Sequence, residues 1–475
     1  MAGTDATVRY QVLADDLAGR IARGQLKPGD RLPSVRELCR IHTASPATVT
    51  HALHLLEDHS LIEARPRSGF FVRRKPRLIA PPEQCATPGL PQTVELAEHH
   101  RLLMEFRRGI DRDWLGRARI DPALYPSVAL QRHMTQLARR EPNLLAQDVS
   151  ANGDRALCEQ LARRSVLLGC DWSPDEILVT HGETQAIAIA LHVTTKPGDV
   201  IAIQAPSHMS QLNVLEVEGR QVVEIPSHPC DGLSVDALEI ALERGNIAAC
   251  VLSANFPNPT CSLMSDEAKQ RTVTILAAHK VPLIEDDTGG DLYFGERRPP
   301  PFKAFDDTGN VLYCSDLSTI LGTGLSLGYV VSGRYRIAFE HVQTSICDPV
   351  PLLFQRMAAA FMEGGQFEPY LRRLRHALAD NVAAYRDLIA EHFPVGTRVA
   401  DTPGGYLLWA ELPRQIDTAE LQRQALPHGI HFAPGRFFCH QRGFDNCLRL
   451  NAGHLLTPAI EASIAKLGEL AHELA

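Results

Sequence analysis

The chain has 475 residues, of which 44% are hydrophobic and 22% are charged. That length exceeds what a single hydrophobic core supports, so we expect two or three domains of ordinary globular protein. No apolar run reaches the roughly 20 residues that span a bilayer, and the acids in residues 1–25 exclude a signal peptide, so we expect a cytoplasmic chain. The 11 cysteines form no CxxC pair and no metal-ligand spacing, so we expect reduced thiols and no metal site.

Charge is unevenly distributed along the chain. Residues 1–75 contain 12 Lys and Arg against 8 Asp and Glu, whereas the whole chain has a net charge of −8. A basic head on an acidic body is typical of a protein whose head meets nucleic acid while the body does something else.

The sequence pattern of the head, residues 1–75, predicts three helices and a hairpin. Apolar residues recur at helical spacing over residues 7–23. Ser34 and Glu37 form a capping box before a second helix, and Ser45 precedes a third helix with Pro at its first position. An apolar pattern over residues 61–72, interrupted by a Pro-Arg-Ser-Gly turn, predicts a hairpin. This order of elements is that of a winged helix-turn-helix.

In such a fold the third helix enters the major groove by its N-terminal end. We therefore expect DNA contacts from the second helix, the start of the third helix and the wing: Arg36, Ser45, Thr48, Thr50, Arg65, Arg67, Ser68 and Gly69. A helical protein-interaction module with merely solvated basic residues is the alternative. The segments LKPGDRLPSVREL and SPATVTHALHLLEDHSLIEARPRSGFFV resemble the GntR-type winged helix along its full length, which favours double-stranded DNA as the partner.

After the head comes a proline-rich linker, and then the chain alternates helical and strand patterns. Seven short apolar runs are expected to be buried strands: Ile177–Val179, Val200–Ile203, Val222–Ile225, Cys250–Leu252, Val281–Ile284, Val311–Cys314 and Gly328–Val331. Such runs, separated by helical sequence, predict an α/β body with a mostly parallel seven-stranded sheet, followed by a smaller α+β part. The predicted domains are residues 1–73, 74–93 (the linker) and 94–475.

Polar residues collect where four of these strands end. They belong to the segments THGETQAI, Gln204–His208, Asn255–Thr260 and Glu285–Asp287. An ordinary solvated loop explains any one of them. Because the carboxyl ends of parallel strands meet at one edge of the sheet, four together favour a ligand crevice.

This order of motifs resembles the fold type I pyridoxal-phosphate enzymes of the aminotransferase class. With the head, it resembles the MocR-type regulators, in which a GntR winged helix is fused to an aminotransferase-like domain. The resemblance implies the positions that would bind pyridoxal 5'-phosphate and substrate. Asp286 matches the acid that pairs with the pyridine nitrogen, Asn258 matches the asparagine that bonds the ring hydroxyl, and His208 matches the aromatic residue that covers the ring. Gly182, Glu183 and Thr184 match the helix N-terminus that cradles the phosphate, and Arg449 matches the arginine that holds the substrate carboxylate.

The segment Ser315–Tyr329 departs from the family pattern. Thr319 stands where the family has the lysine that forms the Schiff base. Asp316 stands where the family has a phosphate-binding serine, and Ser318 lies between Asp316 and Thr319 in the same loop. Ser326 stands where the family has the arginine that neutralises the phosphate. The tyrosine that the family has two or three residues after the pyridine-binding acid is also missing, because Thr-Gly stands there.

These departures all oppose the binding of a phosphate, which carries about −1.5 to −2 charges near neutral pH. Losing the arginine and gaining an acid should each cost on the order of 1–3 kcal/mol, and losing the imine removes the covalent anchor. We expect a catalytically inactive body that binds pyridoxal phosphate weakly if it binds it at all, and that senses a small carboxylate or amino-acid-like effector. The resemblance implies a head-to-tail homodimer. A working aminotransferase with a DNA-binding head and a scaffold that only pairs two heads on an operator are the alternatives.

Overall fold

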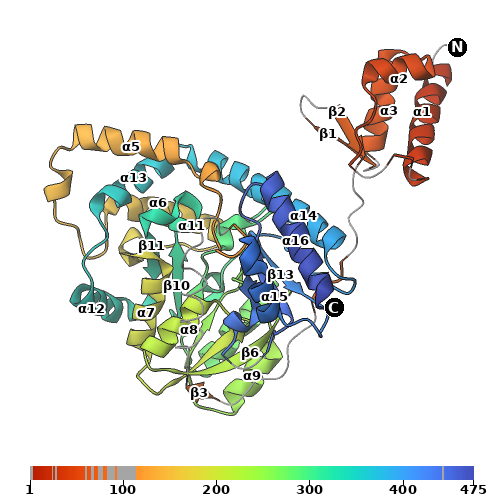
Figure 1. Cartoon of the computed structure of the whole chain (residues 1–475). Helices are drawn as coiled ribbons and strands as arrows, with labels where there is room; N and C mark the ends of the chain where they lie inside the picture. Colours follow the sequence, from red (N-terminus) through yellow and green to blue (C-terminus); the bar gives the residue numbers. More distant parts are fainter. Residues whose placement is uncertain are drawn as a thin grey trace. The chain divides into compact units, whose positions relative to one another are not determined.

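The computed structural model describes residues 4–475 except 24, 27–28, 59–60, 66–68, 73–78, 83–90, 94–113 and 441–442. It divides into two compact units, Met1–Leu78 (the head) and Ile79–Ala475 (the body) (Figure 1). Within the described ranges, no helix is both long enough and apolar enough to cross a membrane.

The head is a winged helix-turn-helix, as predicted. Its elements are α1 (Thr4–Ala22), α2 (Val35–His42), α3 (Pro46–Asp58), β1 (Ile62–Arg65) and β2 (Gly69–Val72). β1 pairs antiparallel with β2, and Arg31 bridges Phe71 on the other side of β2. One apolar core joins all three helices to the hairpin, and its fully buried members include Leu38, Val49 and Leu53. The apolar faces expected from the helical spacing therefore do face inward.

The body is built on a mixed, mostly parallel sheet. The seven predicted strands are all present, as β4 (Ile177–Thr180), β5 (Val200–Ala205), β6 (Gln221–His228), β8 (Ile247–Leu252), β9 (Leu283–Asp286), β10 (Val311–Asp316) and β11 (Gly328–Val331). β6, β5, β8, β9 and β10 run parallel, and β11 lies antiparallel between β10 and β4. Two short strands, β3 (Gln92–Thr93) and β7 (Gly232–Leu233), extend the sheet to nine. A pairing of two residues has no apolar run that sequence periodicity could reveal.

Two pieces of the segment expected to be a linker contact the body. β3 pairs antiparallel with β6. The carbonyl of Ala80 accepts the N–H of Val399 at 3.0 Å. Residue 94 is the predicted start of the body domain. These contacts show that residues before it already pack on the body.

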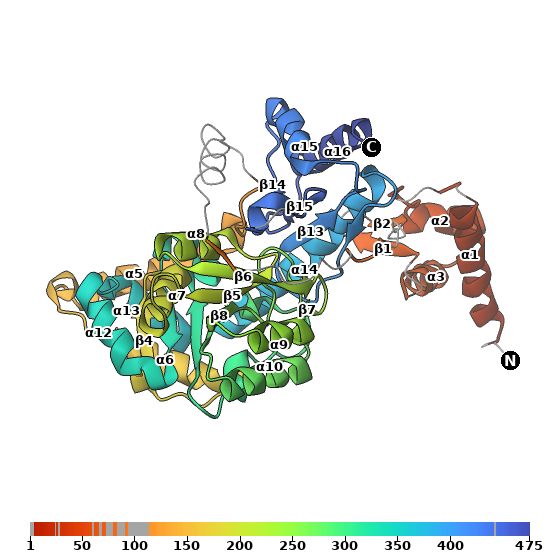
Figure 2. The same ribbon diagram turned by 90° about the horizontal axis from the view of Figure 1, so that it is seen from below.

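Helices cover both faces of the sheet, because alternate residues of each strand point in opposite directions. Leu312 and Cys314 of β10 pack with α7 (Gly182–Thr194), α8 (Met209–Val217) and α12 (Arg336–Ile346). Val311 packs in the core that holds α9 (Val235–Glu243) and α10 (Asp266–Ala278). Figure 2 shows the sheet between α7 and α8 on one side and α9 and α10 on the other. Tyr313 packs in a third core with α5 (Ser127–Arg140), α6 (Arg155–Ser165), α13 (Leu352–Glu363) and α14 (Phe367–His392).

The predicted smaller α+β part completes the body. Its antiparallel sheet has the order β12 (Arg398–Val399), β13 (Leu407–Glu411), β15 (Cys447–Asn451) and β14 (Ala433–Pro434). The C-terminal half of α14, α15 (Thr418–Ala425) and α16 (Pro458–Glu473) share one apolar core with this sheet.

Candidate functional site

The helical residues predicted to meet DNA lie at the surface of the head. Ser45 caps α3, because its Oγ accepts the N–H of Thr48 at 3.2 Å. Ser45, Thr50 and Arg36 are exposed, and Thr48 is half-buried. A stack between the rings of Tyr10 on α1 and His51 on α3, with centroids 4.4 Å apart, helps to fix the angle at which α3 is presented.

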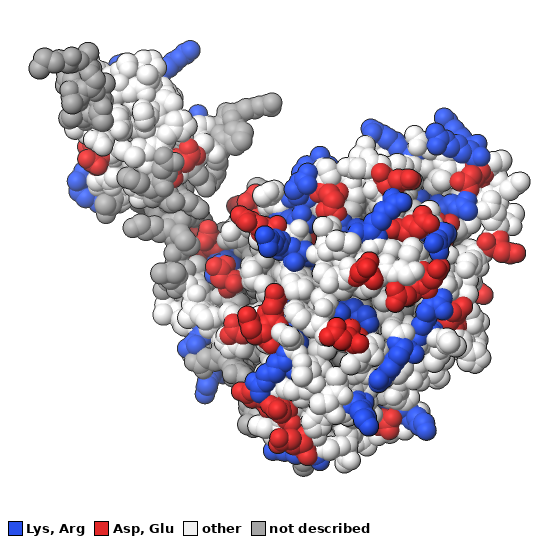
Figure 3. Space-filling model, turned by 180° about the vertical axis from the view of Figure 1, so that it is seen from behind, with Lys and Arg blue, Asp and Glu red and all other residues white. Residues whose placement is uncertain are grey.

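The wing residues are described only in part. Arg65 ends β1 and pairs with Gly69 across the hairpin, whereas Arg67 and Ser68 lie outside the described residues. Gly69 has φ +102°, a left-handed conformation that favours glycine. On the body, the face drawn in Figure 3 intersperses Lys and Arg with Asp and Glu.

On the body, a cavity of about 160 Å³ opens at the carboxyl ends of the parallel strands. It lies where open α/β sheets hold their ligands. Five of the predicted ligand residues line it: Glu183, His208, Asn258, Asp286 and Thr319. The remaining described lining residues come from the loops after β8 and β9, from Ala118 and from the start of β13: Ser253, Phe256, Pro257, Cys261, Thr288, Gly289, Leu292, Gly405, Tyr406 and Leu407.

Three carboxyl groups meet at the end of this cavity beside the N-terminus of α7, which we call the acidic end. Glu183 and Asp286 line the cavity. Asp316 ends β10, and its Oδ2 would lie 3.8 Å from a Cβ placed on Gly182. Burial raises the pKa of Glu183 to about 8, with Asp286 and Asp316 adding to the shift, and burial raises the pKa of Asp316 to about 6. The helix end that would cradle a phosphate therefore faces carboxyl groups.

Asp286 is held by neutral donors on both of its oxygens. Gln211 Nε2 donates to Oδ2 at 2.9 Å, and the N–H of Thr288 donates to Oδ1 at 3.1 Å. Burial raises the pKa of this carboxyl as well. Sequence reasoning missed Gln211, because a polar residue among the apolar residues of α8 gives no sign of which group it will meet.

Six of the eleven predicted ligand residues are not among those that line the cavity: Gly182, Thr184, Asp316, Ser318, Ser326 and Arg449. Ser318, at the start of α11 (Ser318–Leu321), turns inward and its Oγ accepts the N–H of Leu327 at 2.7 Å. Ser326 is exposed, with φ +48°. Thr184 is exposed and its Oγ1 donates to Glu183 Oε2 at 3.2 Å. His208, which does line the cavity, places its Nδ1 2.6 Å from the Oγ of Ser210.

No lysine stands among the described residues that line the cavity. The chain has only seven lysines in all. Two of those nearest in sequence to the site are committed elsewhere: Lys269 is buried on α10 with its Nζ 3.3 Å from Asp266, and Lys303 donates to Asp306 at 2.9 Å. Thr319, predicted from the sequence to stand at the Schiff-base lysine position, lines the cavity.

Asn258 and Arg449, placed 191 residues apart in the chain, are brought together. Arg449, on β15 and 6% exposed, donates from Nη1 to Asn258 Oδ1 at 3.1 Å and from Nη2 to the carbonyl of Gly116. Its guanidinium also lies over the ring of Phe438, 5.1 Å from the centroid. An amide in the cavity wall backed by a planar cation is an arrangement suited to a carboxylate. We call this the carboxylate end.

Phe256 is a cavity residue that the sequence did not indicate. It has φ +53° and is 4% exposed. A Cβ on Gly289 would lie 2.7 Å from the Phe256 carbonyl oxygen, and a Cβ on Gly404 would lie 2.6 Å from its ring. A side chain at position 289, such as the family tyrosine, therefore has no room in this structure.

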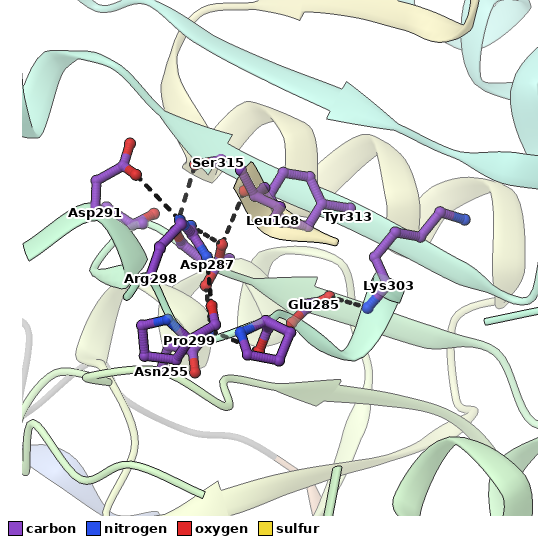
Figure 4. Close-up of polar contacts among 12 residues, drawn as sticks. Leu168, Asn255, Glu285, Asp287, Asp291, Arg298, Pro299, Lys303, Tyr313 and Ser315 are labelled. Atoms are coloured by element: carbon purple, nitrogen blue, oxygen red, sulfur yellow. Dashed lines mark hydrogen bonds and ion pairs between the residues drawn. The ribbon is translucent and has the colours of Figure 1, made fainter. Parts of the chain in front are cut away.

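A charge-matched network forms around Asp287, the residue after Asp286 in the chain (Figure 4). Asp287, 1% exposed, accepts hydrogen bonds from Tyr313 Oη at 2.8 Å and from Arg298, which also pairs with Asp291 at 3.0 Å. Because these buried acids have a cationic partner, the network supports the loop after β9 and differs from the acidic end of the cavity.

The residues present do not fit an imine-bound, phosphate-bearing cofactor. Carboxyl groups gather on the phosphate side of the cavity, the hydroxyl of Thr319 cannot form an imine, and the Phe256 carbonyl leaves no room for a tyrosine at position 289. Of the residues that line the cavity, only Asp286 and Asn258 match groups that would hydrogen-bond the ring of pyridoxal phosphate. In the part of the chain that the structure describes, no cluster of His, Cys, Asp and Glu could hold a metal ion.

Comparison with known families agrees with both units. Residues 9–72 match the family model described as bacterial regulatory proteins, gntR family, and residues 135–461 match that of aminotransferase class I and II. The fold and site define a body of the aminotransferase class joined to a GntR-type head.

Full-length relatives have the same two parts. The chain is 33% identical over 464 residues to the HTH-type transcriptional regulator YjiR of Escherichia coli, covering 97% of this chain and 98% of YjiR. It is 28% identical to the regulator TauR of Rhodobacter capsulatus, covering 94% of this chain and 93% of TauR. The chain belongs to the MocR-type transcription regulators, with a GntR winged helix fused to an aminotransferase-like domain.

Solved structures place the body among aminotransferases. LysN, the α-aminoadipate aminotransferase of Thermus thermophilus, superposes with a TM-score of 0.72 at 25% identity, covering 78% of this chain and 94% of LysN. That enzyme was crystallised in complex with N-(5'-phosphopyridoxyl)-L-leucine.

Proposed function

We propose that this protein regulates transcription by binding an operator through its head, and that its aminotransferase-like body is a non-catalytic module that binds an effector and dimerises. The observation that carries the proposal is Thr319 in a cavity whose described lining contains no lysine. A hydroxyl cannot form the imine on which amino-group transfer depends. Covalent binding of pyridoxal phosphate is therefore lost, and non-covalent binding through Asp286 and Asn258 is weak.

The retained carboxylate end supports the effector role. Arg449 and Asn258 lie in contact and could hold the carboxylate of a ligand. The lysine with which family enzymes act on such a ligand is not among the described residues that line the cavity. We propose a small carboxylate as the effector and a head-to-tail homodimer as the assembly that places two heads on a two-part operator.

The DNA-binding part is tested by fluorescence anisotropy of the full chain with duplexes from upstream of its own and adjacent genes. We expect specific binding with Kd of roughly 10⁻⁸ M or tighter at physiological salt. Arg36→Ala should weaken binding to all sequences and lower the salt slope by about 1. Arg140→Ala, on α5 of the body, is the matched control and should change neither. Absence of any sequence preference would contradict the proposal.

The non-catalytic part is tested with pyridoxal phosphate and a panel of amino donors. We expect no transfer of the amino group and no visible absorbance band of a lysine-bound cofactor. Transfer that Arg449→Ala abolishes would instead identify the protein as an aminotransferase with a DNA-binding head.

A further inference from the structure

We propose that the effector carries a cationic side chain as well as a carboxylate, and that this side-chain cation occupies the acidic end made by Glu183, Asp286 and Asp316. The carboxylate occupies the carboxylate end at Asn258 and Arg449, so the ligand class is a basic amino acid. The inference rests on the proposed function, because it names the ligand of that same cavity.

Within the described residues, the acidic end has no cationic side chain bonded to it. Its three carboxyl groups come from three separate elements, α7, β9 and β10. The donors that they meet are neutral: the hydroxyl of Thr184, the amide of Gln211, and the backbone N–H groups of Thr288 and Ser318. No Lys or Arg appears among the cavity-lining residues that the structure describes. Asp287, the residue after Asp286, is in contrast paired with the cation of Arg298.

Ser253 provides a second, independent indication of a ligand. It follows β8, is 5% exposed and lines the cavity. Its backbone N–H donates to Gln204 at 2.9 Å, whereas its hydroxyl has no hydrogen-bond partner among the described residues. Buried hydroxyl groups are normally satisfied, and a hydroxyl facing a cavity can accept a hydrogen bond from an ammonium or guanidinium group.

Electrostatics favours a cation over the phosphate of the family cofactor. A phosphate would add about −1.5 to −2 charges to a place that already holds three carboxyl groups. A cation would relieve their mutual repulsion and would favour their ionised forms. The size of the cavity agrees with this class of ligand, since about 160 Å³ lies below the roughly 300–1,000 Å³ of sites for drug-sized molecules.

Binding of the cation should release protons. The raised pKa of Glu183, about 8, means that this group holds a proton near neutral pH, and the raised pKa of Asp316, about 6, means that Asp316 holds one in slightly acidic solution. A bound cation favours the ionised forms and displaces these protons. The other titratable groups that line the cavity are His208, Cys261 and Tyr406, and burial raises the pKa of both Cys261, to about 11, and Tyr406. Tyr125, which also faces Asp316, has its pKa raised by burial to about 12. Affinity should therefore increase as pH rises from 6 to 8.

The test is ligand-induced thermal stabilisation of the full chain, followed by tryptophan fluorescence. All three tryptophans, Trp114, Trp172 and Trp409, lie in the body, so this signal reports on it alone. The probes are L-lysine, L-ornithine and L-arginine, each at about 10 mM, with L-norleucine as the matched control that lacks only the terminal ammonium of lysine. We expect at least one basic amino acid to raise Tm by about 2–4 °C or more and norleucine to leave it unchanged.

Variants locate the effect. Asp316→Asn and Glu183→Gln keep the shape of each side chain and should each weaken binding of the basic amino acid at least about 10-fold. Glu296→Gln makes the same chemical change on an exposed residue outside the cavity lining and should leave the affinity unchanged.

The possible failures are distinguishable. Equal stabilisation by norleucine and lysine would overturn the cationic inference while leaving a carboxylate effector in place. No stabilisation by any of the three basic amino acids would overturn the inference as well. Stabilisation by pyridoxal phosphate at micromolar concentration, with a lysine-bound absorbance band, would instead overturn the proposed function.

Discussion

The head and the acidic end of the cavity differ in how well their residues favour the folded structure on their own. In the head, the capping box at Ser34, the helical spacing of apolar residues and the hairpin pattern all favour the structure that forms. At the acidic end, three carboxyl groups gather at a helix N-terminus with no cationic partner in the described parts of the chain, and burial raises the pKa of Glu183 to about 8. Where a segment only has to fold, its local sequence signals are expected to agree with the structure that forms. Where a ligand completes a site, unfavourable features such as buried acids without a cation are expected.

The same difference separates two kinds of buried charge within the body. The network around Asp287 and Arg298 supplies its own cation and needs no ligand. Glu183, Asp286 and Asp316 have only neutral donors among the described residues. Variants of the cavity should therefore change ligand binding and pH dependence, whereas variants of the head should change only stability or DNA binding.

The largest expected effect is a restored cofactor site. The triple variant Asp316→Ser/Thr319→Lys/Ser326→Arg returns the family groups to the phosphate side and supplies the imine nitrogen. Each polar change contributes on the order of 1–3 kcal/mol, so pyridoxal phosphate should bind at least about 100-fold more tightly than to the natural chain. The measurement is a spectroscopic titration, with Thr319→Lys alone as control. Equally tight binding by that single variant would show that the acidic end does not oppose phosphate.

Crowding around Phe256 predicts the next effect. Gly289→Ala places a Cβ 2.7 Å from the Phe256 carbonyl and should lower the free energy of unfolding of the body by about 1–3 kcal/mol. Gly324→Ala, where no atom lies within 4 Å of the new Cβ, is the control. Urea unfolding followed by tryptophan fluorescence measures both. If the two variants unfold alike, position 289 is not closed to a side chain.

The pH dependence of stability should have opposite signs in the two regions. Folding raises the pKa of Glu183 from 4.5 to about 8, so the folded body holds an additional proton between these values and its stability falls as pH rises through this window. Glu183→Gln should remove about 1–2 kcal/mol of that fall between pH 5 and 8, measured by urea unfolding at each pH. In the head, the bonds from Ser34 lower the pKa of Glu37, so that contribution is lost as pH falls. A body whose pH profile is unchanged in Glu183→Gln would contradict the account of the acidic end.

The smallest effect concerns the cap of α2. Ser34→Ala removes a side chain that accepts the N–H of Glu37 at 3.3 Å, and should cost about 1 kcal/mol of local stability. Hydrogen exchange of the α2 peptide in the full chain measures it, with Ser34→Thr as the conservative control. Tryptophan-detected unfolding of the body should not change, and a change there would show that the two regions are energetically coupled.

Much of the fold could be predicted because it depends on local signals. Period-3.6 apolar spacing, a capping box and short β-branched runs gave the winged helix and the seven main strands. β3 and β7 were missed because pairs of two residues leave no periodic pattern. The convergence of Glu183, Asp286 and Thr319 followed from strand ends, whereas Gln211 and Phe256 could not be foreseen, because the direction of a side chain within a helix or loop depends on packing.

Native mass spectrometry of the full chain after incubation with about a tenfold excess of pyridoxal phosphate tests the central claim most directly. The account predicts the mass of the polypeptide without the cofactor and an unchanged visible spectrum. Retention of one pyridoxal phosphate per chain at micromolar affinity would contradict it.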